Sequence, residues 1–182
     1  LTWNARRYFD NGYILLIGIS FLFVGFIDLI HTLAYKGMGV YPGYNSDLPT
    51  QLWIAARWLQ ALAFFAATFF LDRKLNRPLV VLAGGAVLSA LLLLSIFYWN
   101  IFPSCFVEGT GLTPFKIASE YGISLILLIS IVPLTKKKDK LHPRVRQLII
   151  ASILSTVASE MSFTLYTDAY GFFNALGHFL KV

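Results

Sequence analysis

Six ionisable side chains interrupt stretches of sequence that are otherwise apolar enough to cross a membrane. They are Asp28, His31, Arg57, Glu120, Glu160 and His178. A charged side chain in hydrocarbon costs a few kcal/mol or more unless it is paired or hydrated, so such residues mark a functional site by default. Carboxylates, imidazoles and a guanidinium can bind an ion or a polar ligand. We therefore expect recognition to take place at these residues.

Counting residues along the predicted helices places all six side chains near the same face of the membrane. Asp28 and His31 lie three residues apart, on one helical face. At about 1.5 Å per residue, each of the six lies within about 10 Å of the same end of its segment. We expect five of them to converge in one outward-facing polar cavity: Asp28, His31, Arg57, Glu160 and His178. Glu120 either joins the rim of this cavity or is merely solvated at the interface.

Long apolar segments must position these residues. Hydrophobic residues make up 57% of the chain and charged residues 13%, against about 25% charged in soluble domains, and the mean hydropathy is +0.68. A spanning helix needs about 20 apolar residues. Five segments approach or reach that length: Tyr13 to Leu33, Gln51 to Leu71, Leu79 to Asn100, Lys116 to Leu134 and Gln147 to Tyr166.

A sixth apolar segment begins near Gly171 and stops short at Val182. The predicted fold is therefore all-α, a polytopic transmembrane bundle of about six helices, the last one truncated. Residues 1–182 are predicted to form a single domain within a longer protein, because Leu1 to Gly12 shows no initiating Met and no signal region. The single cysteine excludes an internal disulfide. Three glycines are expected to mark close helix packing: Gly84, Gly85 and Gly122.

Basic residues predict the orientation, because Lys and Arg prefer the cytoplasmic side of short loops. Eleven of them fall on one side of the predicted bundle: Arg6, Arg7, Arg73, Lys74, Arg77, Lys136, Lys137, Lys138, Lys140, Arg144 and Arg146. Only Lys36 and Lys116 fall on the other side. We expect a multi-pass protein of the cell (inner) membrane with the loop from Lys136 to Arg146 in the cytoplasm. Topology explains this basic loop better than a nucleic-acid patch does, so no nucleic-acid partner is expected.

Each polar residue also has a purely structural interpretation. Arg57 either contacts a ligand or pairs with Asp28 or Glu160 to hold helices together. Asp28 and His31 are either a hydrogen-bonded pair or ligands of a divalent metal, for which His178 and Glu160 are further candidates. His31 and His178 are also a pair that could ligate haem, although two histidines are weak evidence for it. The sequence therefore assigns no cofactor.

The sequence contains no recognised catalytic signature. It lacks a GxSxG motif, an HExxH motif and a glycine-rich phosphate loop. We predict that this domain is not itself an enzyme. The alternative is a membrane-embedded transporter, or a quinone- or haem-linked redox enzyme, that uses the same polar layer. A transporter is expected to carry repeats or broken helices near mid-membrane, and neither is visible in the sequence.

Two runs carry a resemblance to a known family. The first is GFIDLIHTLAYKGMGVYPGYNSDLPTQLWIAARWLQ, residues 25–60, and the second is NALGHFLKV, residues 174–182. Together they resemble the membrane-associated sensor domains of type three in the MASE series. Ten residues fall on the motif positions: Asp28, His31, Tyr35, Lys36, Gln51, Trp53, Arg57, Asn174, His178 and Lys181. Members typically have another helix upstream and a complete last helix, and this sequence shows neither.

The resemblance implies a sensory input module of a bacterial or archaeal signalling protein. Such a module signals to a cytoplasmic output domain in the same chain, of histidine kinase or diguanylate cyclase type. We expect it to bind an unidentified small ligand or ion in the outward-facing pocket and to form a homodimer in the lipid bilayer. The predicted ligand-binding residues are Asp28, His31, Tyr35, Gln51, Trp53, Arg57, Glu160, Asn174 and His178.

Overall fold

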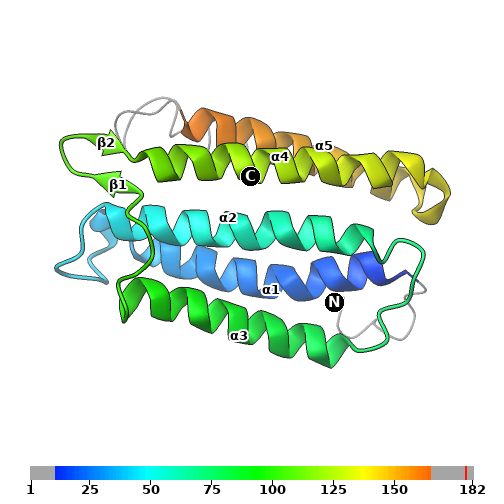
Figure 1. The fold of residues 1–182 in the computed structure, drawn as a ribbon, viewed down its shortest axis with the longest axis horizontal. Coiled ribbons are helices and arrows are strands. Elements are labelled where there is room, and N and C mark those ends of the chain that lie inside the picture. Colours follow the sequence, from blue (N-terminus) through cyan, green and yellow to red (C-terminus); the bar gives the residue numbers. More distant parts are fainter. Residues whose placement is uncertain (1–10, 165–178, 180–182) are drawn as a thin grey trace.

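The computed structural model describes residues 11–164 and Phe179 of the 182-residue chain, and within these residues it is a bundle of antiparallel helices (Figure 1). The five α-helices are α1 (Gly12–Leu33), α2 (Asp47–Thr68), α3 (Pro78–Phe97), α4 (Pro114–Lys136) and α5 (Pro143–Phe163). Four short elements lie between them: η1 (Lys36–Met38), β1 (Phe106–Val107), β2 (Gly111–Leu112) and η2 (Lys138–Lys140). The predicted helical architecture is confirmed in this part of the chain. The predicted sixth segment lies outside the described residues.

Two helices begin four residues earlier than their apolar stretches predict. Helix α2 begins at Asp47 instead of Gln51, and α5 begins at Pro143 instead of Gln147. Proline is favoured in the first helical turn because its fixed φ suits the helix and its missing N–H is not needed there. An aspartate in the first turn complements the positive end of the helix dipole. Hydropathy alone misses such polar first turns.

The loops gather at the two ends of the bundle (Figure 1). Residues 34–46 and 98–113 form what we call the hairpin end, where β1 pairs antiparallel with β2. Residues 69–77 and 136–146 form what we call the basic end. Because successive helices alternate in direction, the C-terminal part of α1 and the N-terminal part of α2 lie at the same end. This alternation brings the candidate residues of both helices to the hairpin end.

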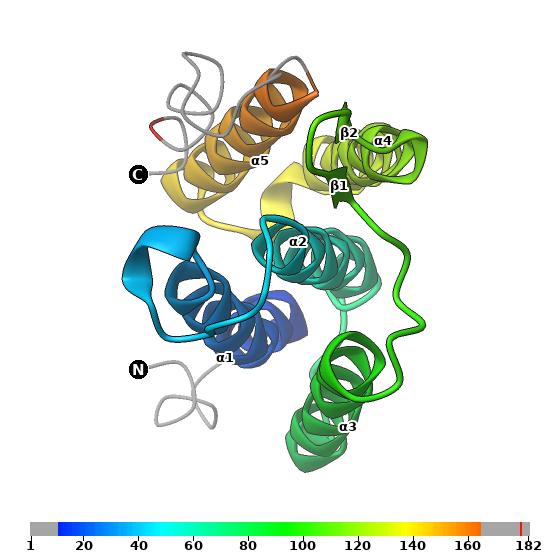
Figure 2. The ribbon, with the colours of Figure 1, turned by 90° about the vertical axis from the view of Figure 1, so that its left-hand side faces the viewer.

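Helix α2 lies at the centre of the bundle and contacts α1, α3 and α4, while α5 packs on α4 (Figure 2). Most of α2 is therefore buried, and its polar residues Arg57 and Gln60 are held inside the protein. Helix α3 is the opposite case, because among its residues only Ser89 and Ile96 are buried. In the described part of the chain, α1, α3 and α4 are long and apolar enough to cross a membrane. The apolar outer face of α3 thus suits contact with lipid.

The glycine positions test the prediction of close helix packing. A Cβ added at Gly85 would lie 2.4 Å from the Phe23 ring of α1. A Cβ at Gly122 would lie 3.1 Å from the Trp58 ring of α2. The prediction is confirmed at these two positions and wrong at Gly84, which has nothing within 4 Å. Adjacent glycines point to different sides of a helix, so only one of them can face a given neighbour.

Candidate functional site

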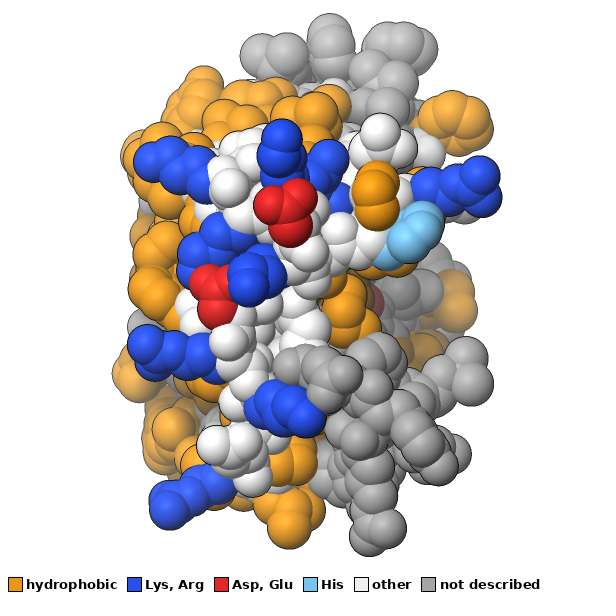
Figure 3. Space-filling view, turned by 90° about the vertical axis from the view of Figure 1, so that its right-hand side faces the viewer, with side chains coloured by type: hydrophobic (Ala, Val, Ile, Leu, Met, Phe, Trp, Pro, Cys, Tyr) orange, Lys and Arg blue, Asp and Glu red, His pale blue; other side chains and the backbone are white. Residues whose placement is uncertain are grey.

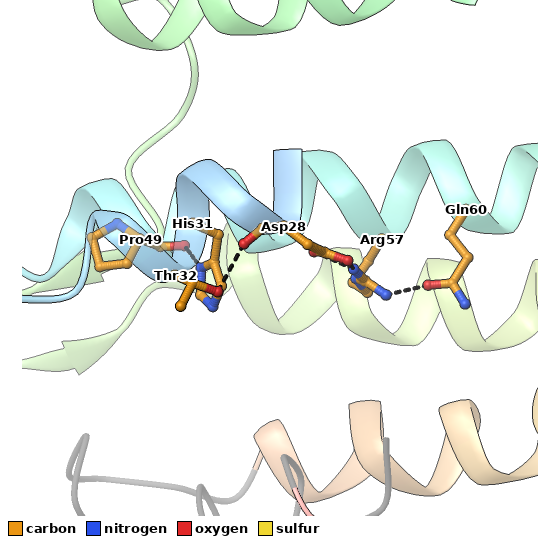
Figure 4. A network of polar contacts seen from close by, with 6 residues as sticks. All are labelled: Asp28, His31, Thr32, Pro49, Arg57 and Gln60. Carbon is orange, nitrogen blue, oxygen red and sulfur yellow. Dashed lines mark hydrogen bonds and ion pairs between the residues drawn. The ribbon is translucent and has the colours of Figure 1, made fainter. Parts of the chain in front are cut away.

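Arg57 lies at the centre of a buried polar network between α1 and α2 (Figure 4). Its Nη2 donates to both carboxylate oxygens of Asp28, and its Nη1 donates to Oε1 of Gln60. The Arg57 side chain is 6% exposed and that of Asp28 is 35% exposed. The sequence allowed Arg57 to pair with Asp28 and so to hold two helices together, and the structure shows this pair. One turn along α2, Gln60 is a partner that the sequence did not single out.

His31 is held by the first turn of α2. Its Nδ1 lies 2.7 Å from the carbonyl oxygen of Pro49. Because a carbonyl only accepts, Nδ1 carries the hydrogen, and in the neutral ring the lone pair then lies on Nε2. The ring stands edge-on to Tyr35, 5.7 Å between centroids, and lies 5.2 Å from the Trp53 ring. The structure thus brings three of the predicted ligand-binding residues into contact.

Trp53 connects this group to the other half of the bundle. The Arg57 guanidinium carbon lies 4.8 Å from the centroid of the Trp53 ring, a cation–π distance. On its other side, Trp53 packs edge-on against Phe163 of α5, with the centroids 4.8 Å apart. Trp53 therefore contacts residues of α1, α2 and α5. A change in the position of its ring would alter packing contacts with all three helices.

A second group of charges is fully buried between α4 and α5. The Nζ of Lys116 lies 2.7 Å from Oε1 of Glu120 and donates to the carbonyl oxygen of Phe163. Lys116, Glu120 and Glu160 are each exposed by no more than 1%. Glu160 is close enough to interact electrostatically with Lys116. Phe163 thus contacts both groups, through its ring with Trp53 and through its backbone with Lys116.

One expectation about this second group is wrong, and one of its members was not singled out in the sequence. Glu120 is not solvated, because it is 0% exposed and paired with Lys116. Lys116 was counted only as a basic residue on the outer side, whereas Thr113 caps α4 and places Lys116 in the first turn of the helix, where it is buried. The spacing of four residues between Lys116 and Glu120 was the available signal, since such pairs meet on one helical face.

Gln51 lies apart from both buried groups. Its Nε2 donates to the carbonyl oxygens of Phe102 and Pro103, at 3.2 and 3.3 Å. It lines a pocket of about 400 Å³ at the hairpin end, together with polar residues that include Asn45 and Asn100. Gln51 therefore contributes to the loop structure at the mouth of the bundle. Its predicted role in ligand binding stays a prediction.

Asp47 holds the hairpin end together. One carboxylate oxygen accepts hydrogen bonds from the backbone N–H groups of Cys105 and Phe106, both at 2.7 Å, and the other accepts from the Ser104 hydroxyl at 2.7 Å. Cys105 is fully buried by this arrangement. Burial, and secondly the nearby Asp47 charge, raise the pKa of the Cys105 thiol to about 12. The loop before α4 is thus fixed to the start of α2.

Parts of the predicted site depend on residues that the structure does not describe. The described residues contain no group of three or more His, Cys, Asp or Glu side chains placed to hold a metal ion. Asn174 and His178 lie outside them, so the convergence of His178 with the other residues stays a prediction. The same holds for a metal or haem that would use His178. What the structure places together is a chain of contacts from Asp28 through Trp53 to Lys116.

Comparison with known proteins adds one match. The family model MASE3, described as a membrane-associated sensor domain, matches residues 1–182. No curated protein and no solved structure matches the chain. The matched range includes the two runs, residues 25–60 and 174–182, on which the resemblance in the sequence rests.

Proposed function

The chain belongs to the MASE3 family of membrane-associated sensor domains, and from that premise we propose that it detects a small ligand or ion at the hairpin end. The signal passes through the helices to a cytoplasmic output domain in the same chain, of histidine kinase or diguanylate cyclase type. The basic end faces the cytoplasm in this proposal, because Lys and Arg prefer that side. The full-length protein acts as a homodimer.

The observation that carries the proposal is the chain of buried contacts across four helices. Asp28 of α1 pairs with Arg57 of α2, Arg57 contacts Trp53, Trp53 contacts Phe163 of α5, and Phe163 accepts a hydrogen bond from Lys116 of α4. Charges buried in a membrane protein are expensive and are retained at functional sites. These contacts join helices that run to the basic end, so they support a role in transmission.

A ligand can use this arrangement by competing for its charged groups. An anion that binds Arg57 would replace Asp28, and a cation that binds Asp28 would replace Arg57. Either event changes which helix pairing is favoured. A ligand shifts such an equilibrium only by its difference in affinity for the two states, and the coupling is typically about 1 to 3 kcal/mol.

The decisive experiment measures the output of the full-length protein in membranes. A thermal-shift screen with metal salts, carboxylates, quinones and haem first identifies a stabilising compound, since a ligand specific for the native state raises stability with its concentration. His31→Ala and Arg57→Ala should then abolish the response to that compound while basal output is retained. The matched controls are His142→Ala and Arg144→Ala, because both residues are exposed at the basic end.

Two results would contradict the proposal. Normal responses in His31→Ala and Arg57→Ala would show that the buried network does not transmit the signal. Transport or turnover of the compound by residues 1–182 alone would favour a carrier or a redox enzyme. Orientation is tested separately with Thr110→Cys and Lys138→Cys in a Cys105→Ser background. An impermeant thiol reagent added to intact cells should label only the cysteine at position 110.

A further inference from the structure

A groove of about 760 Å³ lies at the basic end, where the loop after α2 enters α3. Its lining combines two kinds of side chain. Three are cationic: Arg73, Lys74 and Arg77. The others include the apolar Phe70, Leu75 and Val80. A groove lined by both cationic and apolar side chains matches an amphipathic anion, whose charge can contact the basic residues and whose chain can contact the apolar ones.

The positive charge of this groove is not cancelled by its acidic neighbour. Asp72 precedes Arg73 in the loop, but its carboxylate pairs with Lys137 and lies 3.4 Å from Nζ of Lys140. The acid is therefore neutralised by a different loop. Figure 3 shows this end of the molecule, where Lys and Arg side chains greatly outnumber the acidic ones. Three cationic side chains, Arg73, Lys74 and Arg77, line the groove.

The groove lies at the level where lipid headgroups are expected. Helix α3 begins at Pro78, directly after Arg77, and is one of the helices apolar enough to cross a membrane. Leu79 and Val80 in its first turn are 66% and 62% exposed. An acyl chain can lie along this exposed apolar face while its phosphate meets the three cations. Basic pockets of this kind between helix ends bind anionic headgroups.

The backbone of the groove is fixed by the start of α1. The N–H of Gly12 donates to the carbonyl oxygen of Arg73 at 2.9 Å. A Cβ at Gly12 would lie 2.7 Å from that oxygen and 2.9 Å from the N of Leu75. The close approach requires glycine at this position. The cations therefore project from a loop that is tied to the bundle at a defined place.

We propose that this groove is a binding site for an anionic phospholipid, with the phosphate on Arg73, Lys74 and Arg77 and an acyl chain along the apolar start of α3. The site is separate from the sensory network, which lies toward the hairpin end. Lipid bound here would fix the depth and tilt of α3 at the membrane surface.

The test is a titration of the full chain, purified in mild detergent, with phosphatidylglycerol and with phosphatidylcholine, read out by native mass spectrometry. The wild type should bind phosphatidylglycerol more tightly than phosphatidylcholine. The variant Arg73→Gln/Lys74→Gln/Arg77→Gln should bind phosphatidylglycerol more weakly by a factor on the order of 10 to 100. Because all three side chains are exposed, the variant should keep its helical circular dichroism.

The matched control is Lys136→Gln/Lys138→Gln/Arg144→Gln, which removes the same charge from exposed positions of the same end. It should change phosphatidylglycerol binding by no more than about 2-fold, since these residues do not line the groove. An equal loss in both variants would mean diffuse attraction to the basic end and would overturn the site. No loss in the groove variant, or no preference of the wild type for phosphatidylglycerol, would also overturn it.

Two further arms separate a lipid from a free anion. Inorganic phosphate and glycerol phosphate, each added at the concentration of the lipid, should not displace phosphatidylglycerol, because they lack the acyl chain that the apolar wall binds. Displacement by either would show a phosphate site and contradict the lipid proposal. The charge-preserving variant Arg73→Lys/Arg77→Lys should bind phosphatidylglycerol nearly as well as the wild type. A loss there as large as in the glutamine variant would contradict charge recognition.

Discussion

Two aspartates at opposite ends of α2 each fix a neighbouring loop, but they bind different kinds of donor. Asp47, in the first turn, holds the loop before α4 through two backbone N–H groups and one hydroxyl. Asp72, after the last turn, holds the loop before α5 through the ammonium groups of Lys137 and Lys140. Asp47 is half-buried, whereas Asp72 is exposed. The residue type is the same, and the donors and the burial differ.

The difference decides how much each contact contributes. Charge-assisted bonds from backbone N–H groups are short and strong, and they cost little side-chain entropy. Exposed ion pairs with lysine are screened by water and salt and contribute little. The hairpin end is therefore the more rigidly fixed of the two. Among the described residues, the fully buried Lys and Glu side chains, Lys116, Glu120 and Glu160, lie in the hairpin half of the bundle.

The largest expected effect is on thiol reactivity. Because burial raises the pKa of Cys105 to about 12, its thiolate fraction at pH 8 is about one in ten thousand. We expect Cys105 to react with a maleimide about a thousand-fold more slowly than a cysteine at exposed position 138, introduced as Lys138→Cys in a Cys105→Ser background. Labelling kinetics in detergent, followed by mass spectrometry, measure the ratio. Similar rates would mean that the hairpin end opens readily.

The next largest effect is expected from Lys116→Met. The change removes the ammonium group that pairs with Glu120 and interacts electrostatically with Glu160, and breaking a buried ion pair by removing one partner costs about 3 to 5 kcal/mol. Thermal unfolding in detergent measures the loss. The matched control, Lys137→Met, removes an exposed lysine that is also paired with an acid, and its effect should be far smaller. The double variant Lys116→Met/Glu120→Met should recover part of the loss, and a further loss would contradict the pairing.

These buried charges also show where sequence reasoning succeeds and where it stops. The apolar stretches predict the positions of the five described helices, of which α1, α3 and α4 are long and apolar enough to span a membrane. Similar depth made Asp28 one of two possible partners of Arg57, with Glu160 the other, and the fold decides for Asp28. Lys116 was missed because a lysine at the edge of an apolar stretch has the same composition whether it faces water or Glu120. Only packing against α5 decides between the two.

Contacts made through the backbone are likewise absent from the sequence pattern. The bond from Nδ1 of His31 to Pro49 depends on how the loop between α1 and α2 folds back, which no spacing rule gives. Asp47 was not singled out either, since an aspartate after Ser46 is typical of any helix start. Its three donors come from residues more than fifty positions away. Long-range contacts of this kind require the fold.

A smaller effect is expected from Asp47→Ala. The change leaves two backbone N–H groups without their acceptor, and an unsatisfied buried donor costs about 1 to 3 kcal/mol. We expect a loss of stability in this range and faster labelling of Cys105, because the loop that covers the thiol loses its support. Thermal unfolding and maleimide kinetics measure the two effects. Lower stability with unchanged labelling would mean that Cys105 is covered independently of Asp47.

The smallest effect is expected from Asp72→Asn at the basic end. The hydrogen bond from Lys137 is the main cause that holds the pKa of Asp72 below its usual value of 3.8. A carboxyl whose pKa is lower in the folded state stabilises the fold above its unfolded pKa, and this contribution is lost as the pH falls through the folded value. The wild type should therefore melt slightly above Asp72→Asn at pH 7, and the difference should shrink as the pH falls below the usual value of 3.8 and vanish once the folded protein's Asp72 is protonated.

Salt provides the second readout of the same variant. Because Asp72 is exposed, its attraction to Lys137 and Lys140 is screened, and the small difference at pH 7 should shrink further as the salt concentration rises. The difference between wild type and Asp47→Ala should be nearly independent of salt, since its donors are backbone amides at short distance in a half-buried loop. The contrary result is an effect of Asp72→Asn that is independent of salt and as large as that of Asp47→Ala. It would mean that both aspartates contribute equally to the stability of the fold.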